Sequence, residues 1–114
     1  NVCECHAKTE CVQKMAARFG CIIALTGPSD YISNGVNLWQ NTAGHVGMTK
    51  GGTGDVLVGI VGSLATKNEP LLAVQAGVYL SGLLGERLNK QVGTFYNAED
   101  VIEELGRLWK ELVC

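Results

Sequence analysis

The sequence predicts an α/β fold in which short strands with a hairpin lie between one helix and three later helices. A helical apolar pattern over residues 8–19 is followed at once by a short, continuous apolar run at 21–25. An Asn-Gly pair then separates two strand-like segments, 30–33 and 36–40. Three segments of helical length follow residue 55.

The first helix is expected over 8–19, with Gly20 as its stop. One face carries apolar side chains at helical spacing, which are Cys11, Val12, Met15, Ala16 and Phe19. The run at 21–25 is rich in β-branched residues without polar alternation, so we expect a strand that is covered on both faces.

The middle of the chain is expected to contain a turn, a hairpin and a loop. Residues 26–29 form a turn by composition, and Asn34-Gly35 connects the two hairpin strands. Residues 41–54 are too rich in glycine for regular structure, which favours a functional loop.

Three helices complete the predicted fold. The first, from Asp55 to about Thr66, is apolar nearly all round, with Gly59 and Gly62 one turn apart, so we expect it to be buried against another backbone. The second covers about 70–89, after Asn68-Glu69-Pro70 as its start signal.

The last helix, about 97–113, begins with a capping box between Asn97 and Asp100. Its apolar stripe contains Val101, Leu105, Leu108 and Leu112. Its other face is expected to be a solvated surface and carries Glu103, Glu104, Arg107, Lys110 and Glu111.

Length and composition limit the classes of function. A chain of 114 residues has the length of one domain, so we predict that 1–114 is a single domain rather than two domains. A net charge of −2 without a basic cluster disfavours nucleic acid, and no apolar span is long enough for a membrane. Five cysteines favour a reducing cytoplasm, and they leave two interpretations of Cys3, Cys5, His6 and Cys11: a zinc site or reduced thiols.

The run Lys50-Gly51-Gly52-Thr53-Gly54-Asp55 combines a glycine-rich segment with a carboxylate, which is a pattern that indicates a chemical function. Glycines allow close backbone approach, and the first amides of the following helix have no partner within it, so they favour phosphate oxygens. Asp55 in that same turn can accept a proton from a hydroxyl, which predicts phosphoryl transfer. The alternative is a tight loop whose aspartate only caps the helix.

A longer pattern supports the chemical interpretation. The run Asn41-x-x-Gly44-x-x-Gly47-Met48-x-x-Gly51-Gly52-Thr53-Gly54-Asp55-Val56-Leu57-x-Gly59 resembles the NAD(P)H-hydrate dehydratase family of the ribokinase-like superfamily. Leu25-Thr26-Gly27-Pro28, Asp30-x-Ile32-Ser33-Asn34-Gly35 and the segment 76–83 extend the resemblance over most of the chain. The resemblance implies the C-terminal part of a three-layer α/β/α ribokinase-like domain.

The resemblance also implies a reaction and its participants. Hydrated NAD(P)H would be phosphorylated on its hydroxyl by ADP, or by ATP, and would then lose phosphate. Asp55 would be the catalytic base and contact the substrate, while Mg²⁺ would bridge the phosphates without an assigned protein ligand. The implied nucleotide-binding residues are Thr26, Gly27, Pro28, Ser29, Asp30, Gly52, Thr53 and Gly54. Thr26 stands where the family usually has lysine, so the choice of nucleotide stays open.

The family domain is more than twice as long as this chain. We therefore expect either a partner chain that supplies the N-terminal part or association of the chain with itself. Two other functions stay open: a sugar or vitamin kinase of the same superfamily, and a non-catalytic nucleotide-binding module. His45 is either a general acid or an ordinary loop histidine, and Lys50 either attracts phosphate or is a solvated charge.

Overall fold

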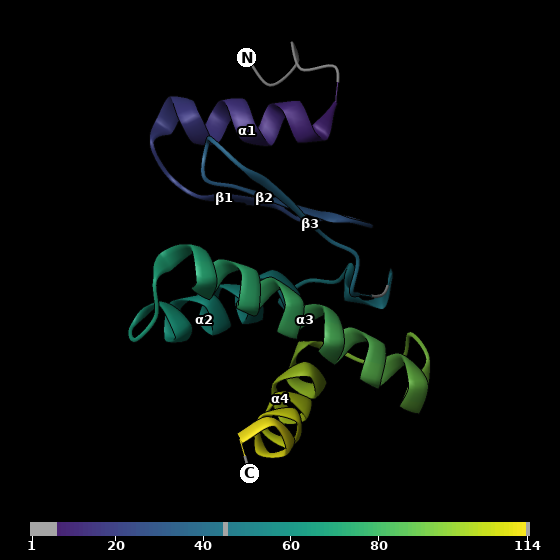
Figure 1. The fold of residues 1–114 in the computed structure, drawn as a ribbon. Coiled ribbons are helices and arrows are strands. Elements are labelled where there is room, and N and C mark those ends of the chain that lie inside the picture. The colour runs from purple at the N-terminus through teal and green to yellow at the C-terminus, as the bar shows by residue number, and fades with distance from the viewer. Residues whose placement is uncertain (1–6, 45, 114) are drawn as a thin grey trace.

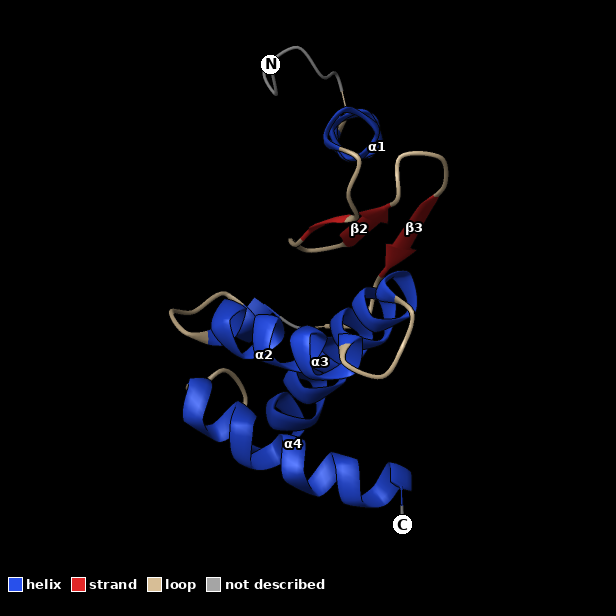
Figure 2. Cartoon of the chain, turned by 90° about the vertical axis from the view of Figure 1, so that its left-hand side faces the viewer, coloured by secondary structure: helices blue, strands red, loops and turns tan. Residues whose placement is uncertain are grey.

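The computed structural model describes residues 7–44 and 46–113 (Figure 1). Helix α1 lies on one face of a small sheet, α2 and α3 lie on the other side, and α4 lies beyond them (Figures 1 and 2). The predicted α/β fold, with a hairpin followed by three helices, is confirmed. In chain order the elements are α1 (Lys8–Phe19), β1 (Ile23–Leu25), β2 (Asp30–Ser33), β3 (Leu38–Asn41), the 3₁₀ turn η2 (Val46–Met48), α2 (Thr53–Ala65), α3 (Pro70–Val92) and α4 (Ala98–Val113).

Helix α1 has the predicted bounds and packs on the hairpin. Val12 and Ala16 are buried, and the Gln13 side-chain amide donates to the carbonyl oxygen of Val36 at 2.8 Å. Gly35 has a φ of 94°, and a β-carbon there would lie 2.8 Å from the Cα of Ala17. Glycine is therefore required where the hairpin loop meets α1.

The sheet has the order β1-β2-β3 with both pairs antiparallel. The prediction that the first strand is covered on both faces is wrong, because Ala24 and Leu25 are exposed. In this sheet β1 is an edge strand that pairs only with β2, and its apolar run reflects strand propensity rather than double-sided burial.

The hairpin is confirmed, but its second strand begins at Leu38 instead of Val36. The side-chain oxygen of Asn34 accepts hydrogen bonds from the amides of Val36 and Asn37, at 3.0 and 2.8 Å. These bonds hold 34–37 as a loop, since a side-chain acceptor competes with strand pairing for the backbone amides.

Helix α2 differs most from expectation. Its buried residues are Thr53 and Ile60, while Gly59 and Gly62 have no neighbouring atom within 4 Å of a β-carbon position. The expected contact between its glycines and another backbone is therefore wrong. The close approach occurs at Gly77 of α3, where a β-carbon would lie 2.5 Å from Val61.

Helices α3 and α4 enclose the core and carry the predicted start signals. The Glu69 side chain caps α3, and Asn97 and Asp100 exchange hydrogen bonds of 2.9 and 3.0 Å at the start of α4. None of the helices in 7–44 and 46–113 is both long and apolar enough to cross a membrane. The core cluster consists of Ile60, Leu80, Leu84, Leu88, Tyr96, Val101 and Leu108.

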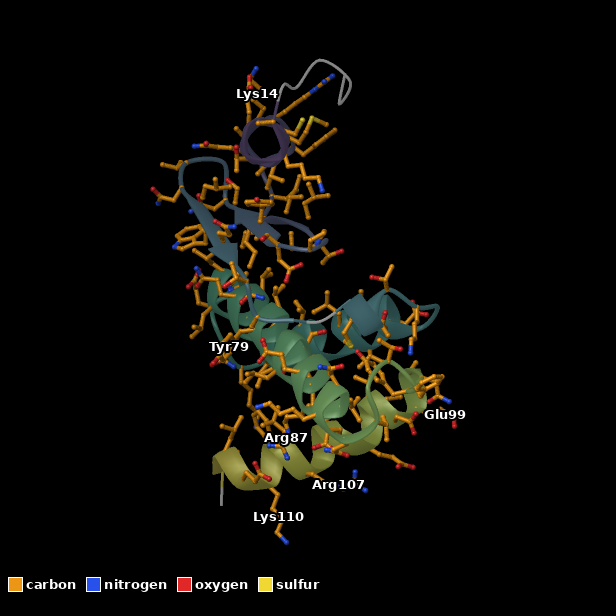
Figure 3. The ribbon with its side chains drawn as sticks, turned by 90° about the vertical axis from the view of Figure 1, so that its right-hand side faces the viewer. Lys14, Tyr79, Arg87, Glu99, Arg107 and Lys110 are labelled. Carbon is orange, nitrogen blue, oxygen red and sulfur yellow. The ribbon has the colours of Figure 1, made fainter. Side chains whose placement is uncertain are left out.

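The predicted solvated face of α4 needs one correction. Glu104 has a relative exposure of 0%, and its carboxylate accepts hydrogen bonds from Arg87 of α3 and Arg107 of α4, at 2.8 and 3.0 Å. Both arginines are labelled in Figure 3. Arg87 also donates two hydrogen bonds to Glu111. This ion network joins α3 to α4. Leu112, a residue of the predicted apolar stripe of α4, is 58% exposed and is therefore not part of the core.

Candidate functional site

A cavity of about 600 Å³ lies between the turn at 26–30, the segments 43–44 and 48–49, the start of α2 and the middle of α3. These segments are distant in sequence, and the tertiary structure brings them together. Six of the predicted site residues line the cavity, which are Thr26, Gly27, Pro28, Asp30, Thr53 and Gly54. Ser29 is not among the lining residues.

The first turn of α2 separates this cavity from a second one. The second cavity, about 900 Å³, lies between α2 and α4, and Gly52 and Asp55 are among its lining residues. Gly54 thus faces the first cavity while Asp55, which is exposed, lines the second. A ligand that crosses the start of α2 would contact both residues.

Asp30 and Asn41 join two walls of the first cavity. One carboxylate oxygen of Asp30 accepts from the amide of Gly27 at 3.1 Å, and the other accepts from the Asn41 side chain at 3.0 Å. Asn41 also donates to the carbonyl oxygen of Ala43 at 3.3 Å. The Asp30 carboxylate therefore shapes the cavity. This role of Asn41 was not predicted, although Asn41 is the first residue of the glycine-rich motif that ends at Gly59.

Residues Ala43, Gly44 and Met48 lie directly against α3, because α3 carries small residues there. A β-carbon at Gly82 would lie 2.4 Å from the carbonyl oxygen of Ala43, and one at Gly85 would lie 2.6 Å from Met48. The amide of Gly44 donates to Glu86 at 3.0 Å. These contacts set the position of the cavity wall relative to α3.

We expect Gly82→Ala to destabilise the chain by about 1–3 kcal/mol, since the added methyl group must displace the Ala43 carbonyl. The control is Gly106→Ala in α4, where a β-carbon meets nothing within 4 Å. That control is expected to stabilise by about 0.5–1 kcal/mol through helix propensity. Urea denaturation of both variants measures the difference, and a shared sign would contradict the proposed contact.

Thr53 and Lys50 form hydrogen bonds that hold the segment before α2 in place. The Thr53 hydroxyl lies 2.6 Å from the carbonyl oxygen of Met48 and 2.8 Å from that of Lys50. The backbone amide of Thr53 also donates to the carbonyl oxygen of Lys50, at 3.4 Å. The Lys50 ammonium donates to the carbonyl oxygens of Thr94 and Tyr96. Lys50 is therefore neither a solvated charge nor directed at a phosphate.

The side chain of Tyr96 packs against the segment that precedes α2, at Gly47 and Lys50. Its ring lies 4.3 Å from the Lys50 ammonium, and a β-carbon at Gly47 would lie 2.6 Å from its hydroxyl oxygen. Burial raises the pKa of the Tyr96 hydroxyl, so the hydroxyl keeps its proton and the side chain is uncharged.

The start of α2 can bind an anion. Gly52 precedes the helix with a φ of 92°, and a β-carbon there would lie 2.9 Å from the side chain of Ala98. The amides of Gly54 and Asp55 follow within the first turn, where α-helices offer no internal acceptor and the helix dipole is positive. Such amides stabilise phosphate oxygens or charge that develops during transfer.

Among residues 7–44 and 46–113 no group of His, Cys, Asp or Glu side chains is arranged to hold a metal ion. Cys3, Cys5 and His6 of the possible zinc site lie outside the described residues, as does His45. Cys11 is a half-buried residue of α1. The choice between zinc site and reduced thiols therefore stays a prediction.

Comparison with known proteins identifies the family. A sequence model described as NAD(P)H-hydrate dehydratase matches residues 2–107. The chain belongs to the NAD(P)H-hydrate dehydratase family. It is 39% identical over 106 residues to the ADP-dependent (S)-NAD(P)H-hydrate dehydratase of Cenarchaeum symbiosum, which covers 92% of this chain and 37% of that protein. It is 42% identical over 88 residues to the bifunctional NAD(P)H-hydrate repair enzyme Nnr of Methanocaldococcus jannaschii, covering 77% of this chain and 18% of that protein.

Solved structures of family members share the fold. The ADP/ATP-dependent NAD(P)H-hydrate dehydratase of Bacillus subtilis, co-crystallised with ATP/Mg²⁺, matches with a TM-score of 0.83 and 31% identity. The match covers 91% of this chain and 39% of that one. A hydroxyethylthiazole kinase from Pyrococcus horikoshii, at 24% identity and a TM-score of 0.78, shows the fold alone. The chain thus has part of the ribokinase-like fold and spans well under half the length of these relatives.

Proposed function

We propose that the chain contributes the nucleotide side of an active site for ADP- or ATP-dependent dehydration of hydrated NAD(P)H. The observation that carries the proposal is the first turn of α2, where Gly54 lines one cavity and Asp55 the other. A nucleotide in the first cavity would meet the amide of Gly54, while a substrate hydroxyl beyond it would meet Asp55.

The proposed roles follow from this placement. Thr26, Gly27, Pro28 and Asp30 line the nucleotide, whereas Ser29 lies outside the lining of the cavity. The amides of Gly54 and Asp55 face the transferring phosphate, because the Thr53 amide already donates to the carbonyl oxygen of Lys50.

Asp55 accepts the proton of the substrate hydroxyl as that oxygen attacks phosphorus. The bond from that phosphorus to the rest of the nucleotide breaks at the same time, which releases AMP from ADP or ADP from ATP. The carbon–oxygen bond of the substrate then breaks, the oxygen leaves with phosphate, and loss of a proton from the neighbouring ring carbon restores the double bond of the reduced nicotinamide. Mg²⁺ supplies charge neutralisation when bound to the phosphates, and the described residues provide no ligand cluster for it.

More than half of the length of the relatives has no counterpart in this chain. The surface that recognises the substrate would come from the part of a ribokinase-like domain that 1–114 does not span, in the same protein, in a partner chain or in a second copy. A cytoplasmic location remains a prediction from cysteine content.

The experiment is direct. The chain is incubated with hydrated NADH, ADP and magnesium while the absorbance of reduced nicotinamide is followed, and ATP replaces ADP in a parallel reaction. Recovery of absorbance that requires the nucleotide supports the proposal. A stable phosphorylated product would instead indicate a kinase, and nucleotide binding without any recovery would show that 1–114 by itself does not catalyse the dehydration.

A further inference from the structure

Lys8, the first residue of α1, brings a positive charge to the 26–30 turn. Its ammonium nitrogen lies 3.7 Å from the position that a β-carbon would occupy at Gly27. Lys8 is exposed, and Gly27 lines the first cavity. A helix on the far face of the sheet therefore places a cation beside Gly27, which is one of the residues that line this cavity.

The charges around the cavity make this position significant. Asp30 supplies the one charged side chain among the described lining residues, and it is a carboxylate. The nearby Lys50 ammonium is engaged with the carbonyl oxygens of Thr94 and Tyr96. A ligand with several negative charges would be repelled by Asp30 unless a cation offset that charge.

We propose that Lys8 is a nucleotide-binding residue whose ammonium pairs with the phosphate groups of an adenine nucleotide in the first cavity. This inference rests on the proposed function and adds a residue to it. An ammonium on a flexible four-carbon stem reaches phosphate oxygens as a point charge, without the bidentate geometry of arginine. Lys8 then favours nucleoside diphosphates and triphosphates over the uncharged nucleoside.

The test is calorimetric titration of the chain with ADP, with ATP and, separately, with adenosine, each with and without magnesium. Lys8→Gln is expected to weaken ADP binding by about 5- to 10-fold, between the values for an exposed ion pair and for a charge-assisted hydrogen bond. Adenosine binding is expected to stay unchanged. The loss for ADP should shrink in about 1 M salt, where charges are screened within a few ångströms.

Two further variants sharpen the comparison. Lys14→Gln removes the same charge from the same helix, and Lys14 points away from the sheet (Figure 3), so ADP binding should not change. Lys8→Arg keeps the charge and should retain most of the affinity. Thermal unfolding of each variant verifies that the fold is intact.

The outcomes separate this inference from the proposed function. Binding of ADP by the wild-type chain that Lys8→Gln leaves unchanged would overturn the role of Lys8 and leave the proposed function standing. An equal loss for adenosine and ADP would also overturn it, because the effect would not concern phosphate charge. If the wild-type chain binds neither ADP nor ATP, both proposals fail.

Discussion

Replacing Asp55 with asparagine is expected to slow the recovery of NADH from its hydrate by about 10²- to 10⁴-fold, the usual contribution of a general base. Asparagine has nearly the same shape as aspartate, but its amide does not accept the hydroxyl proton. The first turn of α2, with Gly54 and its amide, is unaltered by the change, so ADP affinity should be retained. Single-turnover rates at saturating ADP and magnesium measure the chemical step.

The matched control is Glu99→Gln in the first turn of α4. Glu99 is an exposed carboxylate next to Ala98, which lines the same cavity as Asp55. The control therefore removes a nearby negative charge without removing the proposed base. Equal rates for the two variants would show that Asp55 is not the base, and a large loss of ADP affinity in Asp55→Asn would assign it to nucleotide binding instead.

Replacing Glu104 with alanine is expected to destabilise the chain by about 3–5 kcal/mol, because Arg87 and Arg107 lose a buried partner. Arg87 keeps its hydrogen bonds to Glu111, but the change removes two charge-assisted hydrogen bonds to a fully buried carboxylate, which is why the loss exceeds the value of a surface ion pair. Urea denaturation measures the change in the free energy of unfolding. Glu103→Ala, an exposed neighbour on α4, is the control, and a similar effect in both would contradict the importance of the network.

The same network predicts a dependence of stability on pH. Burial raises the pKa of Glu104, but hydrogen bonds from Arg87, Arg107 and Gln91 outweigh it and hold the pKa below its ordinary value. A carboxyl whose pKa is lower in the folded state stabilises the fold above its unfolded pKa, which is about 4.3. That contribution disappears as the pH falls through the folded pKa.

Glu104→Gln isolates this effect, since a protonated glutamate resembles glutamine in charge. The stability difference between wild type and Glu104→Gln should be complete above about pH 5 and should shrink as the pH falls below about 4. Denaturation series across this range provide the measurement. A difference independent of pH would show that Glu104 does not act through its charge.

Local sequence signals predicted the elements well. Gly20 ends α1, Asn34-Gly35 marks the hairpin, and the Asn97–Asp100 box starts α4, because each signal acts through the backbone within a few residues. Burial was predicted less well. The apolar run at β1 and the glycines of α2 carry no information about which neighbour, if any, covers them.

The family, the order of helices and strands and the combination of a glycine run with Asp55 follow from the amino-acid sequence alone. The contacts of Asp30 with Gly27 and Asn41, the contacts of Lys50 with the turn at 94–96 and the burial of Glu104 are known only from the folded chain. The reason is physical. Helix starts and turns depend on hydrogen bonds between near neighbours in the chain, whereas the partner of a long polar side chain depends on which distant segment the fold places beside it.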